Sequence, residues 1–478
     1  MAGERKALER ALNDVQSRLR NHPGSLDLLF ERARLLDRLG RTDEARVGYV
    51  DVLQRDAHHF GALNDLGMLL FKAGLRQDAF TCFNAAVAKH PRNAIGHANL
   101  ALVLLRGGEA AKAREHYQTA LSIDPRNTEA HRGLALALAA LGEHTEAESH
   151  RDAGFGTQPI VGLPYRGEGE PVRVLSIVSA GPGNVPWDRF IDDRIFAVWK
   201  AVAEYCTNAT VLPEHDFVLN AVGDADVAAV ALERAAEIAD RSGAPVLNSP
   251  ARVAATGRVE NASRMRDVEG VIAPRTVSVS RDAVAGAGLT FPFLLRAPGF
   301  HTGMHFEMIA APADVAPALA RLPGKDLFAI EYADVRGADG NARKYRVMFV
   351  GGEMFPLHLA ISPDWKVHYF SADMAAHQER RAEEERFLTD PAAVLGTRAM
   401  RALSGIAERL DLDYAGADFA LDRDGSVVLF EANATMVVPV ADPDPRFAYR
   451  RDPIDRIERA VRSLLLRRAG RVTRLRSV

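Results

Sequence analysis

The chain lacks long apolar runs and is poor in cysteine. Its longest apolar run, Leu134 to Leu141, is far short of the roughly 20 residues that a membrane-spanning helix needs. The first ten residues are charged and hold no apolar core of the signal-peptide kind. The two cysteines, Cys82 and Cys206, are far apart in the sequence, so we expect reduced, buried thiols within helices. These absences predict a cytoplasmic protein that is not inserted in a membrane.

A strong excess of charge of either sign is also missing. The formal net charge is −3, with 26% charged and 47% hydrophobic residues. This balance argues against a general nucleic-acid binder or a membrane-surface binder. The composition is globular, and 478 residues are too many for one ordinary core, so we expect about two to four domains.

Several positions recur every 34 residues in the first third of the chain. They are Gly40, Gly74, Gly108 and Gly142; Leu36, Leu70, Leu104 and Leu138; Ala33, Gly67, Ala101 and Ala135; and Ala45, Ala79, Ala113 and Ala147. This pattern, over residues 24–158, resembles the tetratricopeptide repeat, a helix–turn–helix unit. Small residues allow two helices to pack closely, and the glycine ends the first of them. Residues 1–20 are expected to form a preceding amphipathic helix, and the repeat domain is assigned to residues 1–160.

The resemblance implies that the concave face of the repeats binds an extended peptide or a protein partner. Asparagine side chains can hold a peptide backbone, and arginine side chains can meet acidic groups. The candidates on this face are Arg34, Arg38, Asn64, Asn99 and Arg106. The alternative is that each of these side chains is only solvated.

Strand and helix signals alternate after the repeats. Residues 161–171 are rich in glycine and proline and are expected to be a linker. Residues 172–179, 216–222 and 245–248 read as strands, and residues 192–206 and 227–242 as helices. This alternation predicts a small parallel α/β subdomain over residues 172–250.

Residues 417–437 contain a strong hairpin signal, Asp424-Gly425. A two-residue turn at that point would pair Asp418 with Glu431 and Phe419 with Phe430. Asn433 would then share a face with the two carboxylates, because side chains alternate along a strand. Such an oxygen set suits Mg²⁺ ions that also carry phosphate ligands. The alternative is a solvated acidic hairpin.

The order of segments over residues 172–468, closing on this hairpin, resembles the ATP-grasp superfamily, in particular glutathione synthetase and related peptide ligases. The expected fold is multidomain: an all-α superhelical repeat array, then an α+β ATP-grasp module that begins with the small parallel α/β subdomain. Its central and C-terminal subdomains would occupy residues 251–478. Members of this superfamily are often dimers or tetramers, so a homodimer is compatible with the resemblance.

The resemblance also implies roles for named residues. The Mg²⁺ ligands would be Asp418, Glu431 and Asn433. The triphosphate of ATP would be held by Arg258 and Arg296, at positions where lysine is usual, with a planar fork instead of a point charge. A loop over residues 299–303 would cover the phosphates.

The remaining implied roles concern the base and the reacting groups. Adenine would lie against the backbone of Glu331, Tyr332 and Ala333. Lys344 stands where an acid usually contacts the ribose, and Arg346 would stabilise the developing acyl phosphate.

The acceptor region is expected between residues 356 and 369. Lys366 and His368, two apart on an expected strand, would share a face and could orient a carboxylate or take a proton from an amine. A solvated strand is the alternative, and Tyr369 lies beside this pair. The charged segment 372–387 is expected to form a solvated helix or a lid.

The resemblance therefore implies an ATP- and Mg²⁺-dependent carboxylate–amine ligase that forms an amide through an acyl phosphate. The repeats would recruit a peptide or protein substrate. Two alternatives stay open: a phosphotransferase on the same fold, and a nucleotide-binding scaffold that acts through the repeat surface.

Overall fold

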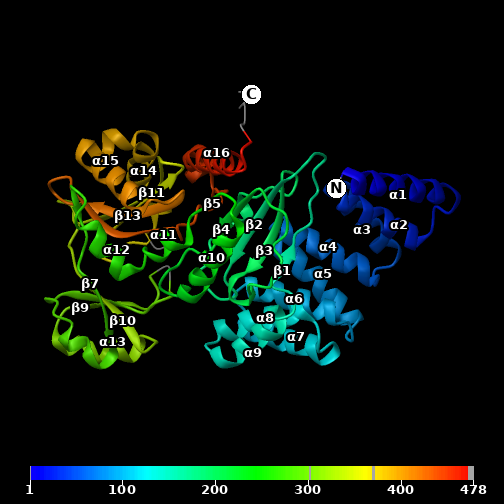
Figure 1. Cartoon of the computed structure of the whole chain (residues 1–478), viewed down its shortest axis with the longest axis horizontal. Helices are drawn as coiled ribbons and strands as arrows, with labels where there is room; N and C mark the ends of the chain where they lie inside the picture. Colours follow the sequence, from blue (N-terminus) through cyan, green and yellow to red (C-terminus); the bar gives the residue numbers. More distant parts are fainter. Residues whose placement is uncertain (1, 301–302, 369–371, 472–478) are drawn as a thin grey trace. The chain divides into compact units, whose positions relative to one another are not determined.

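The computed structural model describes residues 2–300, 303–368 and 372–471, and the chain divides into two compact units. The first comprises residues 1–172 and 193–207, and the second comprises residues 173–192 and 208–478. Figure 1 colours the helices of the first unit from blue to cyan and most of the second unit from green to red.

The first unit consists mainly of helices that follow one another in antiparallel pairs. α1 (Ala2–Asn21) precedes the pairs α2 (Leu26–Arg38) and α3 (Thr42–Arg55), α4 (Phe60–Lys72) and α5 (Arg76–Lys89), α6 (Ala94–Arg106) and α7 (Ala110–Ile123), and α8 (Thr128–Ala140) and α9 (His144–Phe155). The predicted helical repeat is thereby confirmed. Between the helices of each pair lies a glycine with φ between 72° and 85°, a left-handed conformation that glycine adopts without strain; these are Gly40, Gly74, Gly108 and Gly142.

Two further features repeat with the helix pairs. A Cβ added to Gly67 would lie 2.7 Å from the ring of buried Phe83, so the small residue is what allows α4 and α5 to approach. The first helix of each pair is also capped by a side chain that accepts a hydrogen bond from a backbone N–H three residues later. The caps recur every 34 residues, as Ser25, His59, Asn93 and Asn127.

The helix expected over residues 192–206 is wrong. This segment contains strand β3 (Phe196–Val202) and a short 3₁₀ turn, η2 (Ala203–Tyr205). β3 pairs antiparallel with β1 (Ile160–Gly162), which begins just before the expected linker. Its aromatic and β-branched residues suit a strand, and most of them are buried. Cys206 is therefore buried outside a helix, whereas Cys82 is half-buried in α5.

The second unit is a mixed α/β structure. Strands β2 (Val172–Val178), β4 (Phe217–Asn220) and β5 (Val246–Leu247) are parallel neighbours, at the expected positions. Helix α10 (Ala229–Ser242) connects the last two strands of this sheet. The short elements η1 (Trp187–Arg189), α11 (Pro250–Ala254) and α12 (Arg258–Met265) also belong to this part of the unit.

The next sheet of the unit is antiparallel, with strand order β7-β10-β8-β9. Its strands are β7 (Thr276–Ser280), β8 (Phe293–Arg296), β9 (Phe306–Ile309) and β10 (Asp326–Glu331). Helix α13 (Val315–Arg321) and the turns η3 (Arg281–Gly286) and η4 (Pro312–Asp314) complete this layer. Leu295, Ile309 and Leu327 lie in its small apolar core.

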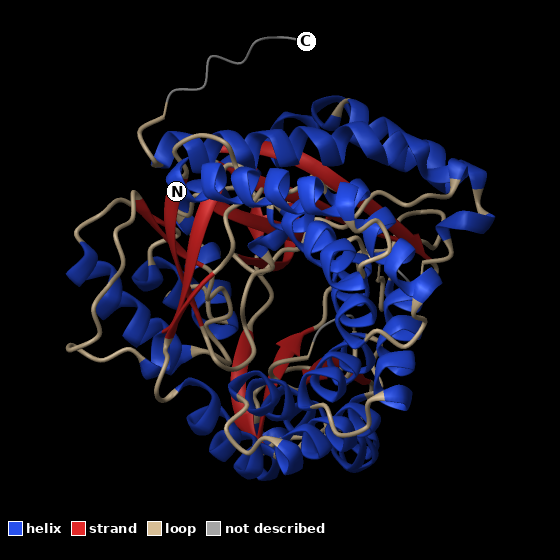
Figure 2. Cartoon of the chain, turned by 90° about the vertical axis from the view of Figure 1, so that its right-hand side faces the viewer, coloured by secondary structure: helices blue, strands red, loops and turns tan. Residues whose placement is uncertain are grey.

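The last sheet has the order β12-β11-β13-β14-β6, with β6 parallel to β14. Its strands are β6 (Val271–Ile272), β11 (Ala342–Val350), β12 (Glu353–Ser362), β13 (Tyr414–Leu421) and β14 (Val427–Asn433). The elements α14 (Gln378–Thr389), α15 (Pro391–Leu410), α16 (Arg451–Arg468), η5 (Met374–Ala376) and η6 (Pro445–Arg450) accompany it. Tyr345, Val347 and Phe419 pack in one core with residues of α14 and α15. Figure 2 shows the strands in red and the helices in blue.

Helix α14 is not the solvated helix or lid that its charge predicts. It begins at Gln378, and its Glu384 is fully buried. The Glu384 carboxylate accepts hydrogen bonds from Arg450, at 2.6 Å, and from the Tyr449 hydroxyl, at 2.5 Å. Phe387, also fully buried, anchors the same helix to the core. The partners lie more than 60 residues away in the sequence, so local charge patterning could not reveal them.

Candidate functional site

A charged surface lies on the face of the last sheet opposite its apolar core. Lys344 and Arg346 are two apart on β11, so their side chains share a face, whereas Tyr345 between them points to the core. Arg346 is paired across the strands with Asp418 of β13. The Arg346 guanidinium donates to both Asp418 oxygens, at 2.5 and 2.7 Å, and Lys344 Nζ lies 2.8 Å from the second oxygen.

The hairpin of β13 and β14 confirms the predicted pairing of Asp418 with Glu431, although its loop and register differ from the prediction. Its loop is longer than a two-residue turn, because Asp422 N–H donates to the carbonyl of Ser426. Phe419 is therefore opposite Leu429, and the predicted pairing of Phe419 with Phe430 is wrong.

A register shift just beyond this point restores the predicted pairing. It lies between Asp418 and Phe419, where Phe430 is the extra residue of β14 and is partly exposed. Asp418 is consequently opposite Glu431, and Gly416 is opposite Asn433. The bulge thus offsets the longer loop.

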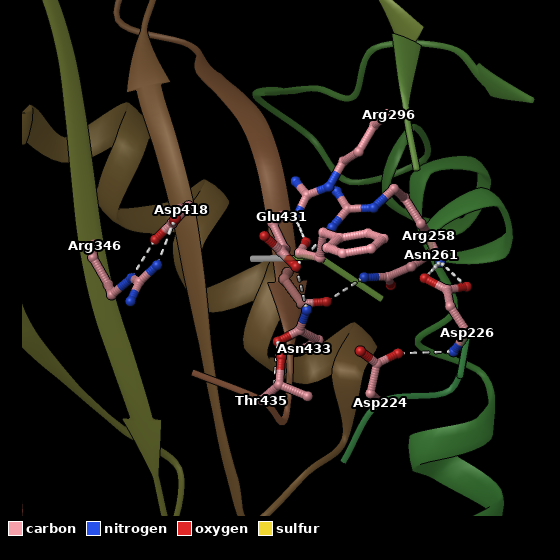
Figure 3. Close-up of polar contacts among 12 residues, drawn as sticks. Asp224, Asp226, Arg258, Asn261, Arg296, Arg346, Asp418, Glu431, Asn433 and Thr435 are labelled. Carbon is pink, nitrogen blue, oxygen red and sulfur yellow. Dashed lines mark hydrogen bonds and ion pairs between the residues drawn. The ribbon is translucent and has the colours of Figure 1, made fainter. Parts of the chain in front are cut away.

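Glu431 is held from two directions (Figure 3). Arg258 donates to Glu431 Oε1 at 2.8 Å, and the Asn433 side chain donates to the same oxygen at 2.9 Å. The side-chain amide oxygen of Asn433 accepts from the backbone N–H and the hydroxyl of Thr435, at 3.0 and 2.8 Å. Glu431 and Asn433 therefore lie side by side, as predicted.

Arg258 is positioned by an aspartate that sequence reasoning missed. Arg258 begins α12, and its backbone N–H donates to the Asp226 carboxylate, at 3.0 and 3.2 Å. The negative charge of Asp226 at the first turn suits the helix dipole. Asp224 in turn accepts from the backbone N–H of Asp226, at 2.9 Å. The signal was available, because both aspartates follow the carboxyl end of the buried parallel strand β4, where binding residues of such sheets gather.

Arg296, at the end of β8, is the second candidate cation. Its guanidinium donates to the carbonyl of Phe300 at 2.6 Å and lies 5.6 Å from the ring centroid of Phe306. Burial lowers the pKa of Arg296, and the neighbouring Arg258 lowers it further. Two guanidinium groups thus face the same site, although only Arg258 bonds to Glu431.

The end of β10 and the loop after it form another wall. Glu331 accepts a hydrogen bond from the backbone N–H of Arg275 at 3.0 Å, so its carboxylate has a local structural bond. Tyr332 and Ala333 follow it, and all three line the same pocket as Arg258. Apolar side chains line this pocket as well, namely Leu294, Phe306, Ile330, Trp365 and Leu429.

Lys366 and His368 line the pocket too, but the strand predicted for them is wrong. β12 ends at Ser362, and residues 363–368 follow as bends and irregular chain. Lys366 Nζ donates to the carbonyl of Phe306 at 2.9 Å. Burial, followed by Lys344 and Arg346, lowers the pKa of His368 to about 4, so this imidazole is neutral at pH 7. His301 and Thr302 of the predicted phosphate-covering loop, and Tyr369 beside the predicted acceptor pair, lie outside the described residues.

Eleven of the twelve predicted site residues line this one pocket of the second unit, and the twelfth, Arg346, bonds to Asp418 in its wall. Residues that the prediction did not include also line it: Asp226, Thr256, Asn261, Arg336, Arg343 and Trp365. Asn261 is buried and donates to the carbonyl of Ala432, which ties α12 to β14.

The two hairpin carboxylates are ionised. Burial raises the pKa of Glu431, but Arg258 and then Arg296 outweigh it and bring the pKa to about 2. Burial likewise raises the pKa of Asp418, and Arg346 and Lys344 outweigh it, so this pKa lies far below its ordinary value.

The oxygen atoms of Asp418, Glu431 and Asn433 decide whether a divalent cation could bind here. Ionised carboxylates and an amide oxygen are ligands that Mg²⁺ accepts. Glu431 Oε1 and both Asp418 oxygens already accept bonds from basic side chains, so a cation would exchange with those bonds. In the described part of the chain, no cluster of three or more His, Cys, Asp or Glu could hold a metal. The predicted set has two carboxylates and an amide, and its donor chemistry fits.

Some side chains of the predicted partner surface in the first unit bond to other side chains of the repeats. The Asn99 side chain donates to the Asn64 side chain at 2.7 Å, and Arg34 lies 3.7 Å from the carboxylate of Asp65. Arg38 and Arg106 are exposed. One hydrogen bond therefore links asparagines of adjacent repeats.

Comparison with known proteins identifies the repeats. Residues 64–128 match the tetratricopeptide repeat family. No curated protein matches the chain. Of the described helices, none is both long and apolar enough to cross a membrane.

Similar solved structures cover the same part of the chain. MamA from residue 41 to its end, from Desulfovibrio magneticus RS-1, is 25% identical, covers 31% of this chain and 83% of its own, and has a TM-score of 0.28. YrrB, a TPR protein with an unusual peptide-binding site, is 21% identical over 30% of this chain and 75% of its own, with a TM-score of 0.28. PilF from Pseudomonas aeruginosa is 22% identical over 32% of this chain and 69% of its own, with a TM-score of 0.30.

The family match and the helix pairs agree, so the first unit contains tetratricopeptide repeats, which indicate protein–protein interaction.

Proposed function

We propose that the second unit is an ATP-grasp enzyme, an ATP- and Mg²⁺-dependent carboxylate–amine ligase, and that the repeats recruit its peptide or protein substrate. The observation that carries the proposal is the pocket itself. Residues chosen for phosphate, adenine, metal and acceptor roles, from β8, β10, β11, β13, β14, α12 and the segment after β12, converge on it.

The proposed reaction has two steps. A substrate carboxylate oxygen attacks the γ-phosphorus of ATP, the bond to the β,γ-bridging oxygen breaks, and ADP leaves. The amine then attacks the acyl carbon, phosphate leaves, and the amine loses a proton as the amide forms. Both steps develop negative charge on phosphate oxygens, so fixed cations stabilise them.

The residues of the pocket divide these tasks. Arg258 and Arg296 hold the phosphates with planar forks, and Lys344 and Arg346 present further positive charge from β11. Glu331, Tyr332 and Ala333 border the space for the base, beside apolar Ile330 and Leu429. His368, with a pKa of about 4, accepts a hydrogen bond from the amine as a neutral imidazole and is a weak base.

Mg²⁺ would be held by Glu431, Asp418 and Asn433, after exchange of the ion pairs that both carboxylates make, and it would neutralise phosphate charge.

A hydroxylamine trap tests the reaction class. The full chain is incubated with ATP, Mg²⁺ and a panel of carboxylates, and hydroxamate and ADP are measured. We expect ATP-dependent hydroxamate with at least one carboxylate, and a loss of about 100-fold or more in Glu431→Gln, which corresponds to about 2.7 kcal/mol in the barrier. Arg234→Gln is the matched control, because it breaks only a surface pair with Glu237.

Other outcomes decide against ligation. A stable phosphorylated product without hydroxamate assigns the site to a phosphotransferase. Nucleotide binding of equal strength in wild type and Glu431→Gln, without turnover, assigns it to a scaffold.

Recruitment by the repeats is tested with a peptide array probed by the full chain. We expect peptides with acidic residues to be retained, and retention to fall about tenfold in a double variant, Arg34→Gln with Arg38→Gln, because arginine bonds to carboxylates are charge-assisted. Equal retention of acidic and neutral peptides would count against this surface. Linking a binding module to a catalytic unit raises the effective substrate concentration without new contacts at the site.

A further inference from the structure

Both carboxylates of the β13–β14 hairpin are bonded to basic side chains that the proposed function assigns to phosphate. Asp418, only 2% exposed, is bonded to Arg346 and Lys344. Glu431, with a side chain 21% exposed, is bonded to Arg258, whose side chain is 14% exposed. The carboxylates expected to bind the metal are thus bonded to the basic side chains expected to bind the anion.

We propose that the Arg258–Glu431 ion pair is a latch that couples the two ligands of the site: phosphate withdraws Arg258 from Glu431, and Glu431 then becomes available to a divalent cation. The latch rests on the proposed function, and it adds an order of events. A polyphosphate anion binds first or together with the cation, and a divalent cation alone binds poorly.

The two ion pairs differ in how easily they exchange. Arg346 bonds Asp418 through two nitrogens, and Lys344 adds a third contact. Arg258 bonds Glu431 through one nitrogen to one oxygen. Bidentate pairs are the stronger ones, so Arg258–Glu431 is the pair that opens.

Charge explains why the anion leads. Arg258, Arg296, Lys344 and Arg346 face only two hairpin carboxylates, Asp418 and Glu431, and arginine keeps its charge at any relevant pH. Even with Asp224 and Asp226 nearby, a bare divalent cation must compete with cations already in place. Because coupling between two ligands is reciprocal, the metal must strengthen anion binding by the same factor.

Arg296 provides a charge-matched comparison within the same pocket. It lies close enough to Glu431 to lower its pKa, but its hydrogen bond goes to the carbonyl of Phe300. Arg296→Gln removes the same charge as Arg258→Gln and leaves the latch bond intact. Both variants therefore lose one positive charge, and only Arg258→Gln also loses the bond to Glu431.

Binding of Mn²⁺, followed by the electron paramagnetic resonance signal of the free ion, tests the latch in the full chain. In wild type we expect Mn²⁺ affinity to rise about tenfold or more when ADP is added, within the usual range of coupling between two sites. Arg258→Gln should bind Mn²⁺ without ADP about tenfold more tightly than wild type does, and ADP should then add little. Arg296→Gln should gain no more than about threefold, the share due to charge alone.

Three results separate the possible failures. Equal Mn²⁺ affinity in wild type with and without ADP, while ADP itself binds, overturns the latch and leaves the nucleotide site standing. If Mn²⁺ affinity without ADP rises equally in Arg258→Gln and Arg296→Gln, the rise is due to lost charge and not to the broken bond, which also overturns the latch. Absence of ADP binding with or without Mn²⁺ overturns both the latch and the proposed function.

A second variant guards against loss of folding. Arg258→Lys keeps the charge and the start of α12, and replaces the guanidinium nitrogen that bonds Glu431 by an ammonium on a shorter side chain. We expect an intermediate rise in Mn²⁺ affinity without ADP, with an unchanged thermal melting curve.

Discussion

The two units of this chain hold their polar groups in different ways. In the repeats, the recurring contacts join neighbouring elements: caps such as Asn93 bond three residues ahead, and Asn99 bonds Asn64 in the adjacent repeat. In the α/β unit, the decisive pairs join distant segments, such as Arg258 with Glu431 and Arg450 with Glu384. Periodic packing between neighbouring helices can be recognised in a sequence. Ion pairs between segments that only the fold brings together cannot. The same difference predicts which parts of the chain a mutation destabilises.

The largest effect should come from removing Glu384. Alanine at this position leaves Arg450, with a side chain only 5% exposed, without its carboxylate partner. Loss of one partner of a buried ion pair costs about 3–5 kcal/mol. Urea unfolding followed by hydrogen exchange should show destabilised β11 and β12 with repeat helices α4–α7 protected as before.

Glu237→Ala, which removes an exposed pair with Arg234, is the control and should cost about 0–1 kcal/mol. Equal costs for Glu237→Ala and Glu384→Ala, or loss of protection in α4–α7, would remove the contrast between the units.

A smaller effect is expected from Gly133→Ala in the repeats. The added methyl group would lie 2.1 Å from the ring of buried Tyr117, so α7 and α8 must separate. Overpacking of this kind costs about 1–3 kcal/mol. Because repeats contact mainly their neighbours, exchange should increase in α6–α9 and hardly at all in α2 and α3. A uniform increase over all repeats would mean that the array unfolds as one cooperative block.

The smallest effect should be a pH dependence set by two pairs of histidines in the repeats. His97 Nδ1 lies 3.1 Å from His116 Nδ1, and His131 Nδ1 lies 2.8 Å from His150 Nδ1. Nε2 of His97 and of His131 lies within 3.1 Å of a proline carbonyl, where a neutral ring donates its proton. Nδ1 of His97 and of His131 then accepts a hydrogen bond from Nδ1–H of the partner ring.

The sign of this dependence follows from the shift. Burial, and then the partner ring, lowers the pKa of His116 and His150 from about 6.5, so the unfolded chain binds more protons. Their stabilisation is complete above about pH 6.5 and is lost as the pH falls toward the lowered values, by under about 1 kcal/mol per pair after screening of these half-buried rings.

Urea midpoints between pH 7.5 and 5.5 measure this effect. The preceding repeat has Leu63 and Cys82 at the same positions, so the double variant His97→Leu with His116→Cys should lose one pair's share of the pH dependence. An unchanged slope in this variant would assign the pH dependence to other groups.

Particular residues show how far the sequence reaches. The pairing of Asp418 with Glu431 was predicted from a two-residue turn, and it is present because a longer loop is offset by the bulge at Phe430. Lys366 and His368 line the pocket without the strand that was expected to align them. Asp226 was missed although it follows the carboxyl end of β4, and its role, holding the first turn of α12, depends on a contact 32 residues away.

The sequence by itself determined the repeats: their period, their glycine turns and the small residues between helices all act within one or two helices, where spacing fixes geometry. It also determined which residue types the hairpin presents. Tertiary structure alone decided that segments from residue 226 to residue 433 line one pocket, and which cation bonds which carboxylate. Such pairs depend on strand order and bulges, and a single displaced residue reverses the face of every side chain that follows.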